Sequence, residues 1–435
     1  MKAVINSQPN KIYITNRSSL EGRIDPNPYH FERINSLKKL QENNELLKLS
    51  DVVKSVKTTT KNISENQVYI GLENILSNSG EYIPSVEKQS ISSAGIFKKG
   101  QILFPKLRPY LNKVYLAEFD GICSTEFHIF DCPIYRNEFL AIYLRSDLIV
   151  NQTKYLMTGN TLPRLQTEDI NRLPVPKISL EKQDEIIALY QNAYKQKQQK
   201  ETEANLLLVS IDAYLLNELG ITIPKKDNSL QDRIYTISFS ELTGGRFDVF
   251  DALNKDSKIE GGIFLNKKLK EVGVFKKGQS ITSERIFDGI YPVIAGGQSS
   301  PYSHNQFNFE GDVITVSASG AYSGYVWYHN APIFASDCTV IKTKDPKVIS
   351  TCFLFELMKL KQKEIYNLQQ GAGQPHVYAS DLAKLNIPIP PRHIQEKMIL
   401  YIQDLRIRAK QLQFDAKSLI ENAKAEIEQK ILGYN

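Results

Sequence analysis

The chain has 435 residues, of which 41% are hydrophobic and 23% are charged. This composition allows a large buried core and at least two domains, and it excludes a disordered polypeptide. The 54 Lys and Arg outnumber the 48 Asp and Glu to give a formal charge of +6, a mild excess that suits a DNA partner but is common among enzymes.

The four cysteines indicate neither a zinc site nor a disulfide framework. Cys123, Cys132, Cys338 and Cys352 are widely spaced and form no Cys-x-x-Cys pair. The first twenty residues lack the apolar core of a signal peptide, and no apolar run reaches the length of a membrane span. We therefore expect reduced cysteines and a cytoplasmic location.

An internal repeat is the most informative feature of the sequence. Residues 100–104 and 122–130 resemble residues 311–315 and 334–341, and Gly22–Asp25 matches Gly245–Asp248 more loosely. A constant offset of 212 residues (375 − 163 = 212), called the repeat offset below, relates Pro163 to Pro375, Asp169 to Asp381, Pro176 to Pro388, and Gln183 to Gln395. An offset of nearly half the chain predicts two homologous halves rather than a solenoid.

Each half begins with a segment of mixed character. Strand-like runs occur at residues 68–71, 113–117 and 127–130 and again at 312–316 and 324–328, while residues 137–147 and 350–368 have helical spacing. We therefore predict an α+β head in each half, with an irregular twisted sheet.

Each half ends in a segment that predicts a helix of about 40 residues, or roughly 60 Å. The first begins near Ser179, a suitable N-cap, and stops at Gly220, while the second begins after Pro390-Pro391 and stops at Gly433. Apolar residues from Met398 to Ile427 follow a coiled-coil spacing. The corresponding stripe from Ile187 to Leu215 has the same spacing but polar residues in its middle. Two such helices can bury their stripes by pairing antiparallel, whereas a stripe on a single helix would more often reflect packing within one domain.

Several short segments of the sequence resemble those of a known protein family. Segments similar to those of type I restriction-modification specificity subunits are Leu103–Lys113 with Gly121–Phe127, and Gly371–Tyr378 followed by Ile387–Pro391. The order of head, helix, head and helix is similar as well, and the resemblance extends from about residue 22 to residue 432.

The resemblance implies the following organisation. A first target-recognition domain (1–178) is followed by a first long spacer helix (179–220), a second target-recognition domain (221–390) and a second long spacer helix (391–435). The expected fold is α+β, with two homologous mixed α/β target-recognition domains separated by an antiparallel pair of long coiled-coil helices and related by a pseudo-two-fold axis.

The resemblance also implies function and partners. Each target-recognition domain reads one half of an interrupted sequence in double-stranded DNA, and the helices act as a ruler and as a dock for methyltransferase subunits, two in number, with room for a restriction and translocase subunit. The methyltransferase would bring S-adenosylmethionine and the restriction subunit ATP. This chain is therefore expected to bind no cofactor and no metal.

The sequence offers no convincing catalytic signature. Asp25–Tyr29 resembles the D/N-P-P-Y motif of amino-methyltransferases, but an extra residue separates its prolines, which favours a turn. There is no P-loop, and Gly371–Gly373 continues to a histidine where a dinucleotide fingerprint needs glycine. The histidines are scattered without metal-ligand spacing. We expect a non-catalytic subunit of an enzyme complex.

The first head concentrates candidate DNA contacts in one stretch. The candidates are Lys98, Lys106, Arg108, Tyr110 and Lys113, which offer positive charge and flexible hydrogen-bond donors. Arg108 is the best candidate for a bidentate contact to guanine. The alternative is that residues 106–113 are a structural strand and turn, with the arginine held against an acidic neighbour.

The second head has a small polar stretch at the matching place. Its candidates are Ser317, Ser319, Tyr322, Ser323 and Tyr325, joined by Gln298 from the loop at residues 295–302. Glycines there would let backbone amides approach a phosphate, and Gln298 could read adenine, although a plain glycine turn is the alternative. Heads that read different half-sites would differ in this way. Gly159–Pro163 and Gly371–Pro375 follow at the junction of head and helix and suggest docking or structural elements.

Two other functions stay open at this stage. The chain could work with a fused methyltransferase-nuclease polypeptide instead of separate subunits, or it could be a coiled-coil scaffold that joins two protein-binding heads. Retention on DNA that weakens steeply with salt would separate the DNA-binding functions from the scaffold.

Overall fold

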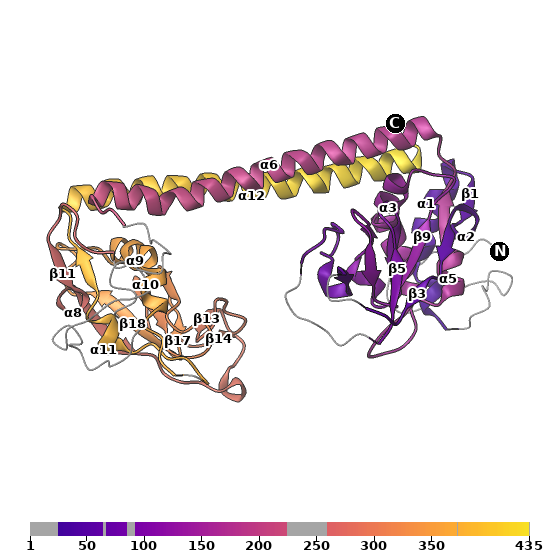
Figure 1. Cartoon of the computed structure of the whole chain (residues 1–435). Coiled ribbons are helices and arrows are strands. Elements are labelled where there is room, and N and C mark those ends of the chain that lie inside the picture. Colours follow the sequence, from indigo (N-terminus) through magenta and orange to yellow (C-terminus); the bar gives the residue numbers. More distant parts are fainter. Residues whose placement is uncertain (1–24, 64–66, 85–91, 224–258, 372, 435) are drawn as a thin grey trace. The chain divides into compact units, whose positions relative to one another are not determined.

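The structure is a computed structural model that describes residues 25–63, 67–84, 92–223, 259–371 and 373–434. It divides into two units, the first formed by residues up to 201 with those from 413 onward, and the second by residues 202–412. Each unit contains one head and a part of both long helices, α6 (Leu180–Leu219) and α12 (Arg392–Leu432) (Figure 1).

The head of the first unit contains two four-stranded sheets. One has the antiparallel order β2 (Lys54–Val56), β9 (Phe127–Asp131), β6 (Ile102–Pro105), β7 (Tyr115–Leu116). The other has the order β3 (Thr59–Thr60), β5 (Ala94–Phe97), β8 (Gly121–Cys123), β4 (Tyr69–Ile70), with β4 parallel to β8. A separate antiparallel pair joins β1 (Leu46–Lys48) to β10 (Pro174–Pro176) at the base of α6.

The helices of this head pack around one apolar core. They are α1 (Phe31–Asn43), α2 (Leu49–Val52), α3 (Asn137–Leu144), α4 (Asp147–Leu156) and α5 (Thr167–Asn171), with the 3-10 turns η2 (Asn27–Tyr29), η3 (Leu72–Asn74) and η4 (Pro109–Leu111). The η2 turn contains most of Asp25–Tyr29, in agreement with the turn predicted for that motif.

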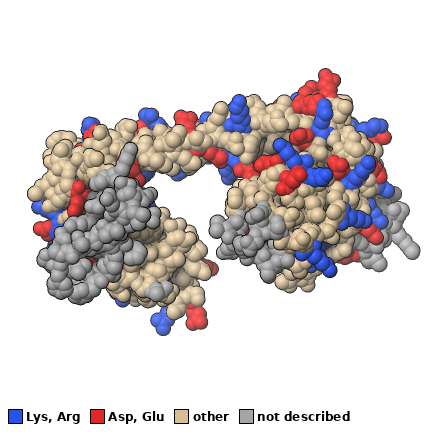
Figure 2. Space-filling model, viewed as in Figure 1, with Lys and Arg blue, Asp and Glu red and all other residues tan. Residues whose placement is uncertain are grey.

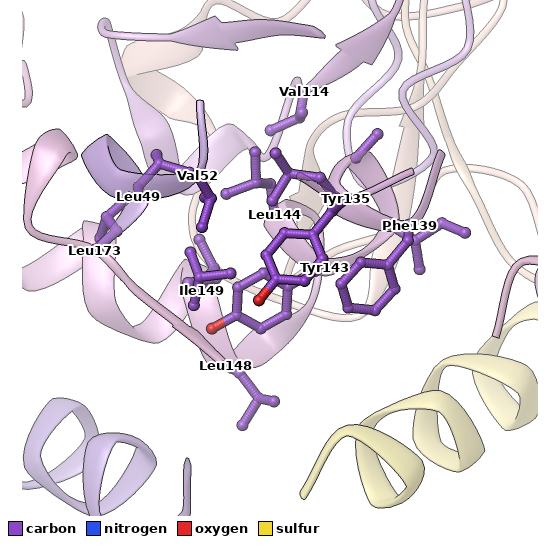
Figure 3. Packing of buried hydrophobic residues seen from close by; sticks show 14 of the residues in the cluster. Leu49, Val52, Val114, Tyr135, Phe139, Tyr143, Leu144, Leu148, Ile149 and Leu173 are labelled. Carbon is purple, nitrogen blue, oxygen red and sulfur yellow. The ribbon is translucent and has the colours of Figure 1, made fainter. Parts of the chain in front are cut away.

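Helix α3 lies at the centre of the core. Its residues 139–144 are all buried, and a helix surrounded by core on every side is expected to be apolar all round. Figure 3 shows the rings of Tyr135, Phe139 and Tyr143 gathered beside the aliphatic side chains of Leu144 and Ile149. The Tyr143 hydroxyl donates to the carbonyl of Pro174 at 2.6 Å, so the core polar group is satisfied.

The head of the second unit has a related arrangement. Its main sheet has the antiparallel order β12 (Gly273–Lys277), β18 (Cys338–Thr343), β15 (Val313–Ser317), β16 (Val326–His329). A smaller sheet has the order β14 (Ser303–His304), β13 (Tyr291–Ile294), β17 (Phe334–Ala335), and β11 (Asn266–Lys268) pairs with β19 (Asn386–Pro388). The helices are α8 (Leu269–Val272), α9 (Thr351–Leu360), α10 (Gln362–Tyr366) and α11 (Ala379–Leu382), with the 3-10 turn η7 (Ser283–Arg285).

The internal repeat is present in the backbone of both heads. Arg164 bridges to Leu107 and Thr158 in the first head, and His376, its counterpart at the repeat offset, bridges to Ser319 and Gln370 in the second. The main sheets match strand for strand, and the pairs β4–β8 and β13–β17 are both parallel. The match of Gly22–Asp25 with Gly245–Asp248 lies, apart from Asp25, outside the described residues.

The long helices pair antiparallel in each unit. In the first unit Glu185 of α6 contacts Lys430 of α12 and Lys200 contacts Asp415, so residue numbers rise along one helix as they fall along the other. In the second unit the rings of Tyr214 and Tyr401 lie 4.2 Å apart, in the same antiparallel register. The predicted α+β class and antiparallel helix pair are confirmed, and the pseudo-two-fold placement of the heads stays a prediction.

The apolar stripe predicted for α12 is buried, with Leu412 and Leu419 only partly so. The stripe predicted for α6 was partly wrong, because Ile186 and Ala193 are buried while Leu208 is 37% exposed. Ile186 belongs to the same core cluster as the head residues Ile142 and Leu173, so α6 turns toward its head as well as toward α12. The part of the chain that the structure describes has no helix long and apolar enough to cross a membrane.

A buried glutamine joins each head to its helix. The side-chain carbonyl of Gln183 accepts from Arg136 N at 2.9 Å, and its amide donates to Ile178 O at 2.9 Å. Gln395 makes the equivalent bonds, accepting from Ser350 N at 3.3 Å and donating to Pro390 O at 2.8 Å. The repeated glutamine is therefore a structural clamp between head and helix.

Candidate nucleic-acid interface

The loop that connects β6 to β7 (residues 106–114, the β6–β7 loop) has an unusual backbone. Arg108 has φ of 48°, in the left-handed region that favours glycine. Its N–H donates to Pro163 O at 2.8 Å, and its carbonyl accepts from Leu111 N at 2.9 Å. A left-handed conformation costs a residue with a side chain about 1–2 kcal/mol.

The loop that connects β15 to β16 (residues 318–325, the β15–β16 loop) has the same backbone geometry. Gly320, the counterpart of Arg108 at the repeat offset, has φ of 89°, donates to Pro375 O at 3.0 Å and accepts from Ser323 N at 2.9 Å. Asn112 and its counterpart Gly324 also share a positive φ, of 51° and 94°. The repeat therefore places the same turn in both heads, with arginine in one and glycine in the other.

The Arg108 side chain is exposed on this turn. No hydrogen bond or ion pair links its guanidinium to any residue that the structure describes. The nearby carboxylate of Glu126 is engaged by a different arginine, since Arg164 binds it through two bonds of 3.1 and 2.8 Å. The alternative in which an acidic neighbour holds Arg108 therefore has no support in this geometry.

The other candidates of the first head fall into different environments. Tyr110 is 43% exposed in the β6–β7 loop, and Lys106 is half-buried near the Glu126–Arg164 pair. Lys113 donates from its ammonium to Leu72 O at 2.8 Å, which braces the fold. Lys98 is exposed in the turn before β6, at the opposite end of that strand from Lys106. The structure thus brings Lys106, Arg108 and Tyr110 together, but not Lys98.

The serines of the second head are mostly turned inward. Ser317 is buried and donates to Ala295 O at 3.3 Å, and Ser323 is fully buried. The hydroxyl of Ser319 donates to the Asp337 carboxylate. These side chains cannot reach a DNA surface without rearrangement, because Ser317 and Ser319 are held by hydrogen bonds and Ser323 is enclosed.

Tyr322 and Gln298 remain accessible in the second head. Tyr322 is 48% exposed, and Gln298 is exposed with its amide 3.5 Å from the Tyr366 hydroxyl. Tyr325 is half-buried, with the Lys359 ammonium 4.2 Å from the centre of its ring. The Gln298 loop packs against the β15–β16 loop, because a Cβ added at Gly296 would lie 2.6 Å from Ser319 O.

The segments that end at Pro163 and Pro375 hold the candidate loops. The sequence suggested docking or structural elements at the junction with the long helix, and the bonds accepted by the carbonyls of both prolines agree with the structural alternative. Arg164, next to Pro163, was missed. Its signal was present, because Pro163 and Pro375 are among the positions that keep the repeat register.

Three buried titratable groups near these loops have pKa values far from neutral. Burial, with the charges of Lys106 and Lys57, lowers the pKa of His128 to about 4. Burial lowers the pKa of His329 to about 4 as well, beside the Thr315 hydroxyl at 2.8 Å, and raises that of Cys123 to about 12. Among the described residues no group of three or more His, Cys, Asp or Glu could hold a metal ion.

Charge differs between the visible faces of the two heads. In Figure 2 blue and red side chains intermingle over the visible face of the first head, whereas the described residues visible on the second head are mostly tan. The second head nevertheless has exposed charged residues, among them Lys276, Lys277 and Lys344.

Comparisons with known proteins identify relatives for part of the chain. Residues 264–422 match the family model described as the type I restriction modification DNA specificity domain. Two Mycoplasma pneumoniae proteins, the putative type I specificity subunits S.MpnORF365P and S.MpnORF201P, are 30% and 31% identical over 234 and 216 residues. These matches cover 49% and 46% of this chain and 82% and 86% of the relatives.

Other matches are more partial or concern the fold alone. The Escherichia coli type I restriction enzyme EcoDI specificity subunit is 27% identical over 150 residues, so the match spans only 34% of that protein and 34% of this chain. A solved structure from a study of complex assembly in the type I R-M system has a TM-score of 0.56 at 17% identity, covering 90% of this chain and 98% of that one.

Proposed function

Because the chain belongs to the family of type I restriction-modification specificity subunits, we propose that it is the DNA-recognition subunit of such a complex and performs no methylation or cleavage itself. Its target is an interrupted sequence in double-stranded DNA. Each head reads one half of that sequence. The proposed boundaries are 1–178 and 221–390 for the heads and 179–220 and 391–435 for the helices.

The observation that carries this proposal is the pair of equivalent loops. The β6–β7 and β15–β16 loops share backbone hydrogen bonds and positive φ values, but their exposed side chains differ. A common scaffold with different donors is what two readers of unlike half-sites need, since base edges are distinguished by donor and acceptor pattern. Strain at Arg108 supports a functional role, because the same turn accepts glycine.

The proposed contact surface is narrower than the sequence suggested. It contains Lys106, Arg108 and Tyr110 in the first head, and Gln298 and Tyr322 in the second. The loops are supported from within by Lys113, Ser317, Ser319 and Tyr325. Ser323 is buried, and Lys98 lies apart from the loops.

The long helices are the proposed dock for two methyltransferase subunits, with room for a restriction and translocase subunit. Several large apolar side chains on them are exposed, including Leu206, Val209, Leu400, Ile407 and Phe414, each at least 65%. Leu400, Ile407 and Phe414 are seven residues apart and so lie along one face of α12, and an exposed apolar stripe of this kind suits a protein-binding surface. The methyltransferase supplies S-adenosylmethionine, so this chain needs no cofactor, and the complex works on DNA in the cytoplasm.

Binding to DNA is the experiment that tests the proposal. The complex with its methyltransferase subunits should bind a DNA that carries the host methylation motif, with an affinity that falls linearly against the logarithm of salt concentration. The isolated chain supplied with S-adenosylmethionine should transfer no methyl group. If the affinity for DNA did not fall with salt concentration, a protein scaffold would be favoured. Methylation of DNA by the chain alone would overturn the assignment.

A further inference from the structure

Two ion pairs join α6 to α12 at corresponding places of the repeat. In the first unit Glu185 of α6 lies 3.8 Å from Lys430 of α12. In the second unit Glu218 of α6 lies 3.7 Å from Lys397 of α12. Both carboxylates belong to α6 and both ammonium groups belong to α12.

The separation of acidic residues on α6 from basic residues on α12 follows the internal repeat. At the repeat offset, Glu185 corresponds to Lys397 and Glu218 corresponds to Lys430. The same two positions of the duplicated helix are therefore acidic in the first copy and basic in the second. The apolar positions differ much less, since Ile186 corresponds to Met398 and Leu215 to Ile427, all buried. At these positions the apolar seam does not distinguish one helix from the other.

A second set of charges links each head to the helix of the other half. Desolvation raises the pKa of Asp212 on α6, and the charges of Lys359 in the second head and Arg406 lower it. In the first unit desolvation lowers the pKa of Lys424 on α12, and Asp147 of the first head raises it. Lys424 also donates to Asn78 O at 3.0 Å, which places it against this head.

This second set is reversed across the repeat in the same way. At the repeat offset, Asp212 corresponds to Lys424 and Asp147 corresponds to Lys359. The first copy is acidic on both its helix and its head at these positions, and the second copy is basic on both. At these positions opposite charges therefore meet only when the two different copies pair.

Pairing between equivalent halves of two chains would reverse these interactions. Two copies of α6 in the same register would place Glu185 opposite Glu218 and Asp147 opposite Asp212. Two copies of α12 would place Lys397 opposite Lys430 and Lys359 opposite Lys424. Exposed ion pairs contribute little stability, but like charges in these positions discriminate between partners, as they do at the flanking positions of coiled coils.

We propose that these charges form a pairing rule that makes the two halves of this chain each other's preferred partners and opposes association between equivalent halves of different chains. The partner recognised by each half is the other repeat copy, identified by opposite charge at four positions. This rule is independent of DNA binding. It opposes the exchange of halves between molecules that share one apolar seam.

One ion pair lies outside the rule. Lys200 of α6 contacts Asp415 of α12 at 3.3 Å. The counterpart of Asp415 in the first copy is Glu203, so two copies of α6 would still place Lys200 opposite an acid. This pair therefore supports the register but does not select the partner, and it is left unchanged in the test.

The test uses full-length chains with reversed charges. Glu185→Lys with Glu218→Lys makes both contact sites basic, and Lys397→Glu with Lys430→Glu makes both acidic. Each double variant should unfold several degrees below the parent, and the variant with all four changes should regain most of that loss. Lys410→Glu with Lys417→Glu, on exposed positions of α12, is the charge-matched control and should leave the midpoint nearly unchanged.

Co-expression of the two double variants is the sharper measurement. The basic α6 of one chain is complementary to the acidic α12 of the other, and the reverse also holds, so the mixture should form a two-chain complex of twice 49.5 kDa. Native mass spectrometry of differently tagged chains should find this complex in the mixture and not in the co-expressed parent. Double variants as stable as the parent, no recovery in the fourfold variant, or no two-chain complex would each overturn the proposal.

Discussion

The β6–β7 loop and the β15–β16 loop share a backbone conformation but carry different side chains. Arg108 and Gly320 occupy the same left-handed position and donate to equivalent proline carbonyls, at 2.8 and 3.0 Å. Glycine occupies this position without strain, whereas arginine costs about 1–2 kcal/mol. The comparison teaches that the turn belongs to the scaffold, and it supports the proposal that Arg108 acts through its exposed side chain.

The largest expected effect comes from unfolding one head, which tests whether the two heads are separate scaffolds. Phe139 is fully buried in the core of the first unit, so Phe139→Ala should destabilise this unit by about 3–5 kcal/mol. Hydrogen exchange resolved by segment should show lost protection in β6 and α3 and retained protection in β15 and α9. Equal loss in both heads would show that they are not separate scaffolds.

Removal of the Arg108 side chain should weaken DNA binding and leave the fold of the first head unchanged. If Arg108 reads a base, Arg108→Ala should weaken binding by about 1–3 kcal/mol and relax one position in one half-site. Binding titrations against single-base variants of the target measure both effects. Lys113→Met is the matched control from the same loop, because the Lys113 ammonium faces Leu72 O. Normal affinity and normal specificity of Arg108→Ala would return this residue to a structural role.

Exchange of side chains at the shared position should shift stability in opposite directions. Arg108→Gly relieves left-handed strain and should stabilise the first head, whereas Gly320→Ala introduces it and should destabilise the second, each by about 1 kcal/mol. A Cβ at Gly320 meets no atom within 4 Å, so strain is the only cost. Denaturant titrations check the signs. Two changes of equal sign would show that the turns are not equivalent.

The smallest expected effect concerns Glu126 and Arg164 beside the β6–β7 loop. The hydrogen bonds from Arg164 lower the pKa of Glu126. Because this pKa is lower in the folded state, the stabilisation is present above the ordinary carboxyl range and is lost as pH falls through the folded pKa. Glu126→Gln should cost less than about 1 kcal/mol at pH 7, since both groups are partly exposed, and the difference from the parent should shrink below about pH 4. A difference that grows on acidification would contradict this sign.

The architecture could be predicted because the sequence contains periodic patterns, namely the internal repeat and the helical spacing of apolar residues. The repeat register and the apolar spacing of residues 398–427 identified two heads and two long helices before any contact was known. The α6 stripe was less well predicted, since Ile186 is buried by a head whose position the helical period does not encode.

The site was predicted only in part, because hydrogen-bond partners lie far apart in sequence. Ser317 and Lys113 were candidates by polarity, yet their side chains satisfy carbonyls 22 and 41 residues away. Arg164 pairs with a carboxylate 38 residues away and was overlooked. The positive φ at Arg108 was accessible in principle, because the repeat aligns it with Gly320.

The central claim is that each head reads its own half of the target on a shared scaffold. Replacement of residues 229–384 with the corresponding head of a related specificity subunit tests it directly, followed by sequencing of methylated sites in cells that carry the methyltransferase subunits. The account predicts that one half of the methylated motif changes while the other half is kept. A change in both halves, or in neither half, would contradict it.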